Sequence, residues 1–183
     1  MNVTTPDPHR RLCARLAELL AYPREEPGPA ARDALVLAGD RPGRAPLARF
    51  EAAAAGAGLH GLQELYTATF DLRPACAPYL GAQLLPEDSP LRGRLLAKLV
   101  EVYEAEGFRP REELADHVAE VLGFLATARS GPVREDLVAD GLVPALDRML
   151  AALDGAQNPY RDLLAAVRAL LAPTTALTHE SAA

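Results

Sequence analysis

The sequence predicts an all-α fold, and three observations support that prediction. Alanine and leucine dominate a composition that is 49% hydrophobic, whereas aromatic residues make up only 5%. Apolar residues recur at steps of three, four and seven along most of the chain, which is the period of a helix. No stretch alternates apolar and polar residues as a half-buried strand does. We therefore expect a single-domain helical bundle of about seven to nine helices, without a sheet, because a chain of 183 residues has the size of one domain.

Four helices are expected in the N-terminal part of the chain. The first follows a polar leader and ends near Tyr22-Pro23, because proline disfavours helix in the residue before it. A loop over residues 24–29 precedes short helices over 30–38 and about 47–55. The glycines of Gly56-Ala57-Gly58 then separate the third helix from a fourth that ends at Phe70.

Residues 71–90 form the longest stretch that is irregular or only briefly helical in pattern, and two interpretations are open. The stretch is either a mobile lip of a binding site or a crossover linker between two helical halves. Helices are then expected from Leu91 to just before Gly107, from Pro110 to about Ala128, over 142–153, and over 160–171. The predicted organisation is a flexible leader over 1–8, a helical domain over 9–172 and a flexible tail over 173–183.

The overall charge limits the classes of partner. The formal net charge is -6 and the sequence pI is near 5.2, which argues against a nucleic-acid binder and is compatible with a basic peptide partner. No stretch approaches the roughly 20 apolar residues of a membrane helix, and the N-terminus lacks the pattern of a secretory signal. Two cysteines without C-x-x-C spacing, Cys13 and Cys76, indicate a reduced, cytoplasmic protein in which both are buried or half-buried.

The sequence contains no recognisable catalytic or metal-binding motif. Its four histidines stand apart, without the spacing of metal ligands, and no nucleotide-binding or hydrolase motif occurs. We expect no metal site, no cofactor and no enzymatic activity. The pair Asp116-His117 leaves two alternatives open: a small helical hydrolase, or an ordinary helix start with a capping residue and a half-buried histidine.

The helix that ends at Phe70 has two different faces. Leu62, Tyr66 and Phe70 share one side, and Glu64, Thr67 and Asp71 share another. The carboxylates of Glu64 and Asp71 are roughly 10 Å apart at the helical rise, which suits separate points of an extended cationic segment. A merely solvated face is the alternative.

A second acidic stripe is expected on the helix that begins at Pro110. It contains Glu113, Asp116 and Glu120, with His117 on its flank.

Several motifs together resemble those of a known family. They are Leu62-Gln63-Glu64-x-Tyr66-x-x-Thr69-Phe70-Asp71, Tyr79-Leu80, Arg92-Gly93, Tyr103 with Gly107-Phe108, Glu113-Leu114-Ala115-Asp116-His117, and Val121-Leu122-Gly123-Phe124-Leu125-Ala126. In this combination the chain resembles the nitrate reductase delta subunit group, the NarJ-type molybdenum cofactor assembly chaperones within the TorD/DmsD family. Two positions depart from the family pattern: Ala115 replaces a proline, which should let the helix start earlier, and Gly123 replaces a frequent glutamate.

The resemblance implies a cytoplasmic, all-helical chaperone and not an enzyme. Such a protein binds the N-terminal peptide of a molybdoenzyme catalytic subunit, here most simply respiratory nitrate reductase, and holds it for molybdopterin insertion before membrane docking. Glu64, Asp71 and Asp116 would then contact basic positions of this peptide, and Tyr66 and Phe70 would form an apolar floor. Thr67, His117 and Glu120 complete the expected peptide-binding set.

Other interpretations remain. The partner could be another enzyme of the dimethyl-sulfoxide-reductase family, and the protein could instead be a structural subunit of a helical assembly. A domain-swapped homodimer is compatible with the long connection over residues 71–90.

Overall fold

The computed structural model of the chain describes residues 7–71, 74–129 and 131–171. Its elements, in chain order, are α1 (Pro8–Leu20), α2 (Gly28–Ala38), α3 (Arg44–Phe70), α4 (Leu80–Leu84), α5 (Leu91–Ala105), α6 (Val118–Thr127), α7 (Pro132–Asp136), the π-helical segment η1 (Leu137–Leu142), α8 (Val143–Ala152) and α9 (Pro159–Leu171). Within these ranges no strand forms, so the all-α prediction is confirmed. The expected tail and most of the expected leader lie outside the described residues.

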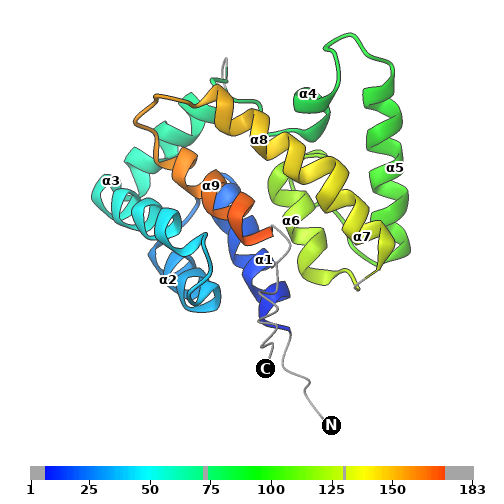
Figure 1. Cartoon of the computed structure of the whole chain (residues 1–183). Helices are drawn as coiled ribbons and strands as arrows, with labels where there is room; N and C mark the ends of the chain where they lie inside the picture. Colours follow the sequence, from blue (N-terminus) through cyan, green and yellow to red (C-terminus); the bar gives the residue numbers. More distant parts are fainter. Residues whose placement is uncertain (1–6, 72–73, 130, 172–183) are drawn as a thin grey trace, which may run out of the picture.

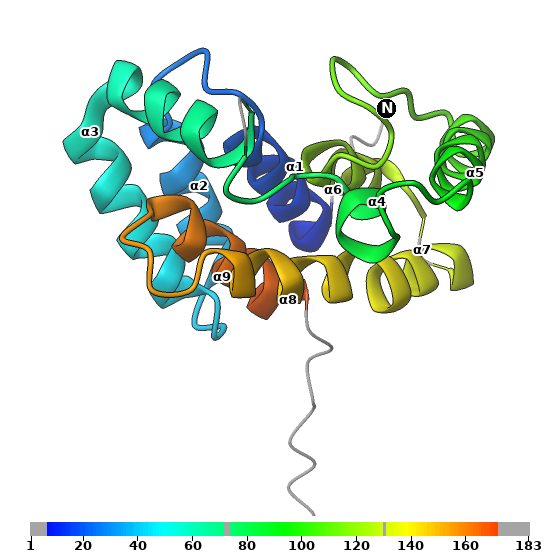
Figure 2. The same cartoon turned by 90° about the horizontal axis from the view of Figure 1, so that it is seen from above.

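Helix α1 lies at the centre of the bundle. It packs against α2 on one side and against α6 on the other, and α3 packs against α2 and α9 (Figure 1). Helices α4 and α5 lie at the end of the molecule away from α3, and the run from α7 to α8 lies along one side (Figure 2). The buried apolar side chains of these elements form one contiguous core. No helix in the described ranges has both the length and the apolar character that crossing a membrane requires.

Helix α3 is broken at Gly58, as the glycines of this region predict. Gly58 has φ 66° and ψ 175°, a conformation that glycine adopts without the steric penalty of a Cβ. The non-helical conformation of Gly58 kinks the helix between its two halves. The motif over residues 62–71 lies in the second half and ends on the C-cap residue Asp71.

The helical run over residues 132–152 widens into π turns in the middle. Val143 N–H donates to the carbonyl of Val138, five residues back. Pro144 follows directly, and its ring cannot donate a hydrogen bond and crowds the carbonyl four residues earlier. The wider turns therefore relieve the conflict between Pro144 and the preceding helix.

The expected helix from Pro110 is wrong, because helix α6 begins only at Val118. The backbone groups before it bond elsewhere: His117 N–H donates to Leu114 O at 2.9 Å, and Tyr103 OH donates to Ala115 O at 2.8 Å. A turn and a long-range contact therefore replace helical hydrogen bonds here. Ala115 does not let the helix start earlier, contrary to our expectation.

The described part of the connection between α3 and α4 is tied to the rest of the molecule. Cys76 N–H donates to Thr69 O at 3.0 Å, Val118 N–H donates to Pro78 O at 2.9 Å, and Leu80 N–H donates to Asp116 O at 2.8 Å. Cys76 itself is buried, as is Cys13, which confirms the expectation for both cysteines. These contacts favour the crossover-linker interpretation over a lip.

A close approach of two helices makes Gly43 a sensitive position. A Cβ added to Gly43 would lie 2.4 Å from Leu170 Cγ and 2.6 Å from Ala166 O of α9. We expect Gly43→Ala to lower the free energy of unfolding by about 1–3 kcal/mol, because α3 must move away from α9. Urea denaturation measures this change.

Gly56→Ala is the matched control for this prediction, because a Cβ at Gly56 has nothing within 4 Å. This substitution should raise the free energy of unfolding by about 0.5–1 kcal/mol, since Gly56 lies inside a helix. Equal effects of the two substitutions would contradict the close packing of α3 on α9.

Candidate functional site

Tyr66 and Phe70 lie in the core and not at a surface groove. Their exposed fractions are 5% and 4%, and their ring centroids are 5.1 Å apart. Tyr160 of α9 lies 5.7 Å from Tyr66 and 5.0 Å from Phe70, in edge-on arrangements typical of aromatic packing. The expected role of Tyr66 and Phe70 as an apolar floor therefore does not fit their placement, because both rings already pack against α9.

Asp116 is also buried, with an exposed fraction of 3%. Its Oδ2 accepts a hydrogen bond from Gly81 N–H at 2.9 Å, which ties α4 to the turn before α6. Burial raises the pKa of Asp116, although the hydrogen bond from Gly81 and the charge of Arg92 oppose this effect. The prediction of a second acidic stripe facing a partner is wrong for Asp116, because the chain leaves the helical path before Val118 and turns this side chain inward.

His117 caps the N-terminus of α6. Its Nδ1 accepts a hydrogen bond from Ala119 N–H at 3.1 Å, and its Nε2 lies 3.5 Å from Tyr66 OH. Burial lowers the pKa of His117 to about 4, and the charge of Glu120 acts in the opposite sense. The ring is therefore neutral at physiological pH and carries its proton on Nε2. Of the two alternatives for Asp116-His117, these contacts favour a structural helix start.

Glu64, Thr67 and Asp71 lie toward solvent on the second half of α3. Glu64 and Thr67 line a shallow depression together with Tyr22, His60, Gln63 and Ala68. Glu64 Oε1 is 3.4 Å from His60 Nε2, which makes an ion pair only when His60 is protonated. Asp71 is exposed at the end of the helix and does not line this depression. The expected division of this helix into a buried and an exposed face is confirmed.

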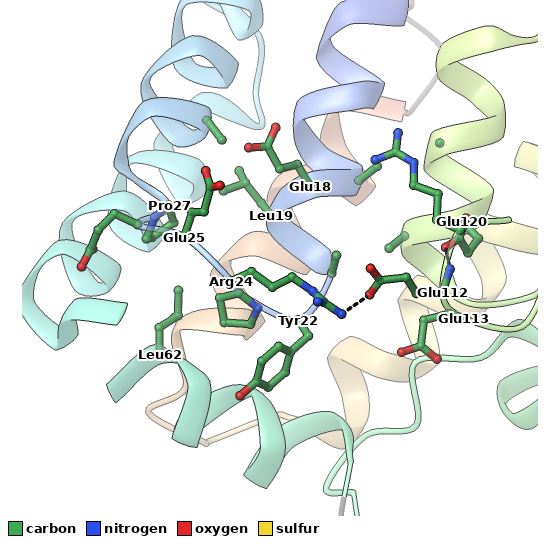
Figure 3. Close-up of a pocket in the computed structure, with 18 residues that line it drawn as sticks. Glu18, Leu19, Tyr22, Arg24, Glu25, Pro27, Leu62, Glu112, Glu113 and Glu120 are labelled. Carbon is green, nitrogen blue, oxygen red and sulfur yellow. Dashed lines mark hydrogen bonds and ion pairs between the residues drawn. The ribbon is translucent and has the colours of Figure 1, made fainter. Parts of the chain in front are cut away.

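A more enclosed cavity of about 400 Å³ adjoins this depression, because Tyr22 lines both. It lies between the α1–α2 loop, the segment before α6, and the facing sides of α1 and α6 (Figure 3). Small and apolar residues form much of its lining, among them Ala17, Leu19, Ala21, Pro23, Pro27, Ala30, Leu62, Ala119 and Gly123. No described residue of the connection over 71–90 lines it.

Gly123 lines this cavity and also lies against the core. A Cβ added to Gly123 would lie 3.2 Å from Phe108 Cζ, which is unusually tight, and Phe108 does not line the cavity. The departure at Gly123 therefore lets the Phe108 ring pack closely on α6.

The cavity carries a strongly negative rim. Its lining includes six glutamates, Glu18, Glu25, Glu26, Glu112, Glu113 and Glu120, and two arginines, Arg24 and Arg111. Such a concentration of one charge sign around an apolar cavity favours a cationic ligand. Glu120 is the one residue of the expected peptide-binding set that lines this cavity.

The sequence pattern groups Glu113 with Glu120 in one acidic stripe, but it does not single out the other four glutamates, because these come from separate elements. Glu25 and Glu26 belong to the loop over residues 24–29, where no helical spacing groups them with other acids. A usable signal was the pair of acids enclosed by Pro23 and Pro27, because a proline-bounded loop holds its side chains in restricted positions.

The described residues offer no metal centre and no activated thiol. No group of three or more His, Cys, Asp and Glu side chains among them is placed to hold a metal ion. Burial raises the pKa of Cys13 to about 11 and that of Cys76 to about 12, so neither thiol is an activated nucleophile. The arrangement is suited to binding.

Comparison with solved structures supports the fold. A crystal structure of a protein assigned as a redox enzyme maturation protein from Archaeoglobus fulgidus superimposes with a TM-score of 0.61 at 19% sequence identity. The match covers 91% of this chain and 96% of that one. Comparison with curated proteins gave no match.

Comparison with protein families gives the more specific result. The sequence model of the family described as nitrate reductase delta subunit matches residues 38–166, well over half of the chain. The match includes the motif over residues 62–71, the segment before α6 and α6 itself. The chain therefore belongs to the nitrate reductase delta subunit family.

Proposed function

We propose that this protein is a cytoplasmic chaperone for the assembly of a molybdoenzyme. It binds the N-terminal segment of the apo catalytic subunit, most simply that of respiratory nitrate reductase, and holds the subunit for molybdopterin insertion before membrane docking. Membership of a family of maturation chaperones, and not of catalysts, supports this function. The observation that carries the proposal is the acid-rimmed cavity with its apolar lining.

The cavity suits a short amphipathic peptide segment. Its volume of about 400 Å³ accommodates a few side chains, and its apolar lining offers them a place to be buried. Carboxylates on the rim then face the basic side chains of the same segment. Because Tyr22 joins the cavity to the depression with Glu64 and Thr67, a longer peptide can continue onto α3.

Binding of the client peptide tests this proposal. We expect calorimetric titration with a peptide that copies the N-terminus of the nitrate reductase catalytic subunit from the same genome to show saturable binding. Affinity should fall modestly with salt, because exposed charge pairs are each worth about 0.2–1 kcal/mol and are screened. The control peptide has glutamine in place of each arginine and lysine, and it should bind more weakly with little dependence on salt.

The remaining outcomes identify or exclude alternatives. Binding only to the corresponding peptide of another dimethyl-sulfoxide-reductase-family enzyme would change the client but keep the function. Co-purification in fixed stoichiometry with a mature enzyme would support a structural subunit instead. Absence of binding to every catalytic-subunit peptide would contradict the proposed function.

The exposed face of α3 has its own test within this proposal. Glu64→Gln combined with Asp71→Asn should lower the affinity for the client peptide about two- to fivefold. It should also reduce the dependence of this affinity on salt, as expected for the loss of exposed charge pairs. Unchanged affinity and salt dependence would show that the peptide does not reach this face.

A further inference from the structure

One ion pair connects the two sides of the acid-rimmed cavity. Arg24, in the loop between α1 and α2, donates from its guanidinium to Glu112 Oε2 at 2.5 Å. The two residues are 88 positions apart in the chain, so the contact joins the α1–α2 loop to the segment before α6. In Figure 3 the Arg24 side chain extends from its loop across to Glu112, with Glu113 and Glu120 nearby on the same side.

The contact is suited to being exchanged. The side chains of Arg24 and Glu112 are 69% and 57% exposed, so water competes for both and the pair is weak. Neither residue belongs to a helix, and an arginine side chain has many rotamers to regain on release. The guanidinium can therefore leave Glu112 at low cost.

Glu120 is the candidate partner for a cation bound in the cavity. It is only 7% exposed, it lines the cavity, and among the described residues it forms no ion pair. One carboxylate oxygen accepts a long hydrogen bond of 3.4 Å from Glu112 N–H. A carboxylate in this position gains a charge-assisted hydrogen bond when a cationic ligand enters the cavity.

We infer that Arg24 occupies the place of a client arginine or lysine: the cationic side chain of the bound peptide displaces Arg24 from Glu112 and pairs with Glu112 and the carboxylate of Glu120. This inference rests on the proposed function, and it specifies where a basic position of the peptide is recognised. Arg24 is then an internal competitor that lowers the affinity for cationic segments. It also covers the acidic rim when no client is bound.

Two substitutions with opposite expected effects test the inference. Arg24→Ala should raise the affinity for the client peptide about two- to fivefold, since it removes a competitor held by one exposed ion pair. Glu120→Gln should lower the affinity for the same peptide about tenfold, because it removes a charge-assisted partner while preserving the size of the side chain. Arg49→Ala is the matched control, because Arg49 also forms an exposed ion pair, with Asp162 at 2.6 Å, but does not line the cavity.

A substituted peptide completes the design. The peptide with glutamine at its basic positions should bind the wild type and Arg24→Ala equally, since it has no cation that competes with Arg24. Thermal unfolding of each variant shows that affinity changes do not arise from loss of folding.

The outcomes separate this inference from the proposed function. Wild-type binding with no gain in Arg24→Ala, or with no loss in Glu120→Gln, would overturn the inference and leave the chaperone function intact. A gain in Arg49→Ala equal to that in Arg24→Ala would overturn it too, because a general charge effect would then suffice. If no variant binds any catalytic-subunit peptide, both the inference and the proposed function are wrong.

Discussion

Phe70→Ala should lower the free energy of unfolding by about 3–5 kcal/mol, the usual cost of truncating a buried aromatic side chain. The ring is 4% exposed and packs edge-on against Tyr66 and Tyr160, so its removal leaves a cavity between α3 and α9. Urea denaturation followed by circular dichroism measures the change. Glu64→Gln, on the exposed face of the same helix, should change stability by less than about 0.5 kcal/mol.

A gentler substitution separates the core role of Phe70 from a binding role. Phe70→Leu keeps much of the buried volume and should leave a folded protein whose affinity for the client peptide equals that of the wild type. If this variant were folded and lost peptide binding, Phe70 would belong to the groove as first expected. A nearly neutral Phe70→Ala would contradict its place in the core.

Lowering the pH from neutral to about 4 should reduce the free energy of unfolding by about 3 kcal/mol, because of the titration of His117. Burial lowers the pKa of His117 from 6.5 to about 4, so the unfolded chain binds a proton that the folded protein excludes. The stabilising contribution is complete above the unfolded pKa and is lost as pH falls toward the folded one, at about 1.4 kcal/mol per pH unit. Glu120, Tyr66 and Tyr79 face the ring and set its surroundings.

His117→Asn isolates this effect, because asparagine also caps a helix N-terminus and does not titrate. The difference in free energy of unfolding between wild type and variant should shrink as pH is lowered from about 7 to about 4.5. Asp116, whose pKa is raised by burial, acts in the opposite sense but is present in both proteins. If the free energies of unfolding of wild type and His117→Asn fell in parallel as the pH is lowered, the loss of stability in acid would not come from His117.

Local sequence was sufficient for most helices and for the two faces of α3. Gly58 and Gly107 interrupt or terminate helices with φ 66° and 74°, as their positions in the pattern indicate. Leu62, Tyr66 and Phe70 are buried while Glu64 and Asp71 are exposed, because helical spacing assigns residues to faces. These features depend on contacts within a few residues, which a sequence displays directly.

Long-range contacts decided what local pattern could not. The sequence by itself determined the all-α class, most helix boundaries and the resemblance to the nitrate reductase delta subunit family. Only the tertiary structure placed Asp116 against Gly81 in the interior and brought Glu112 and Glu120 to Arg24 around one cavity. The physical reason is that burial and electrostatic proximity depend on which elements pack together, and residues 88 positions apart meet only when the bundle closes.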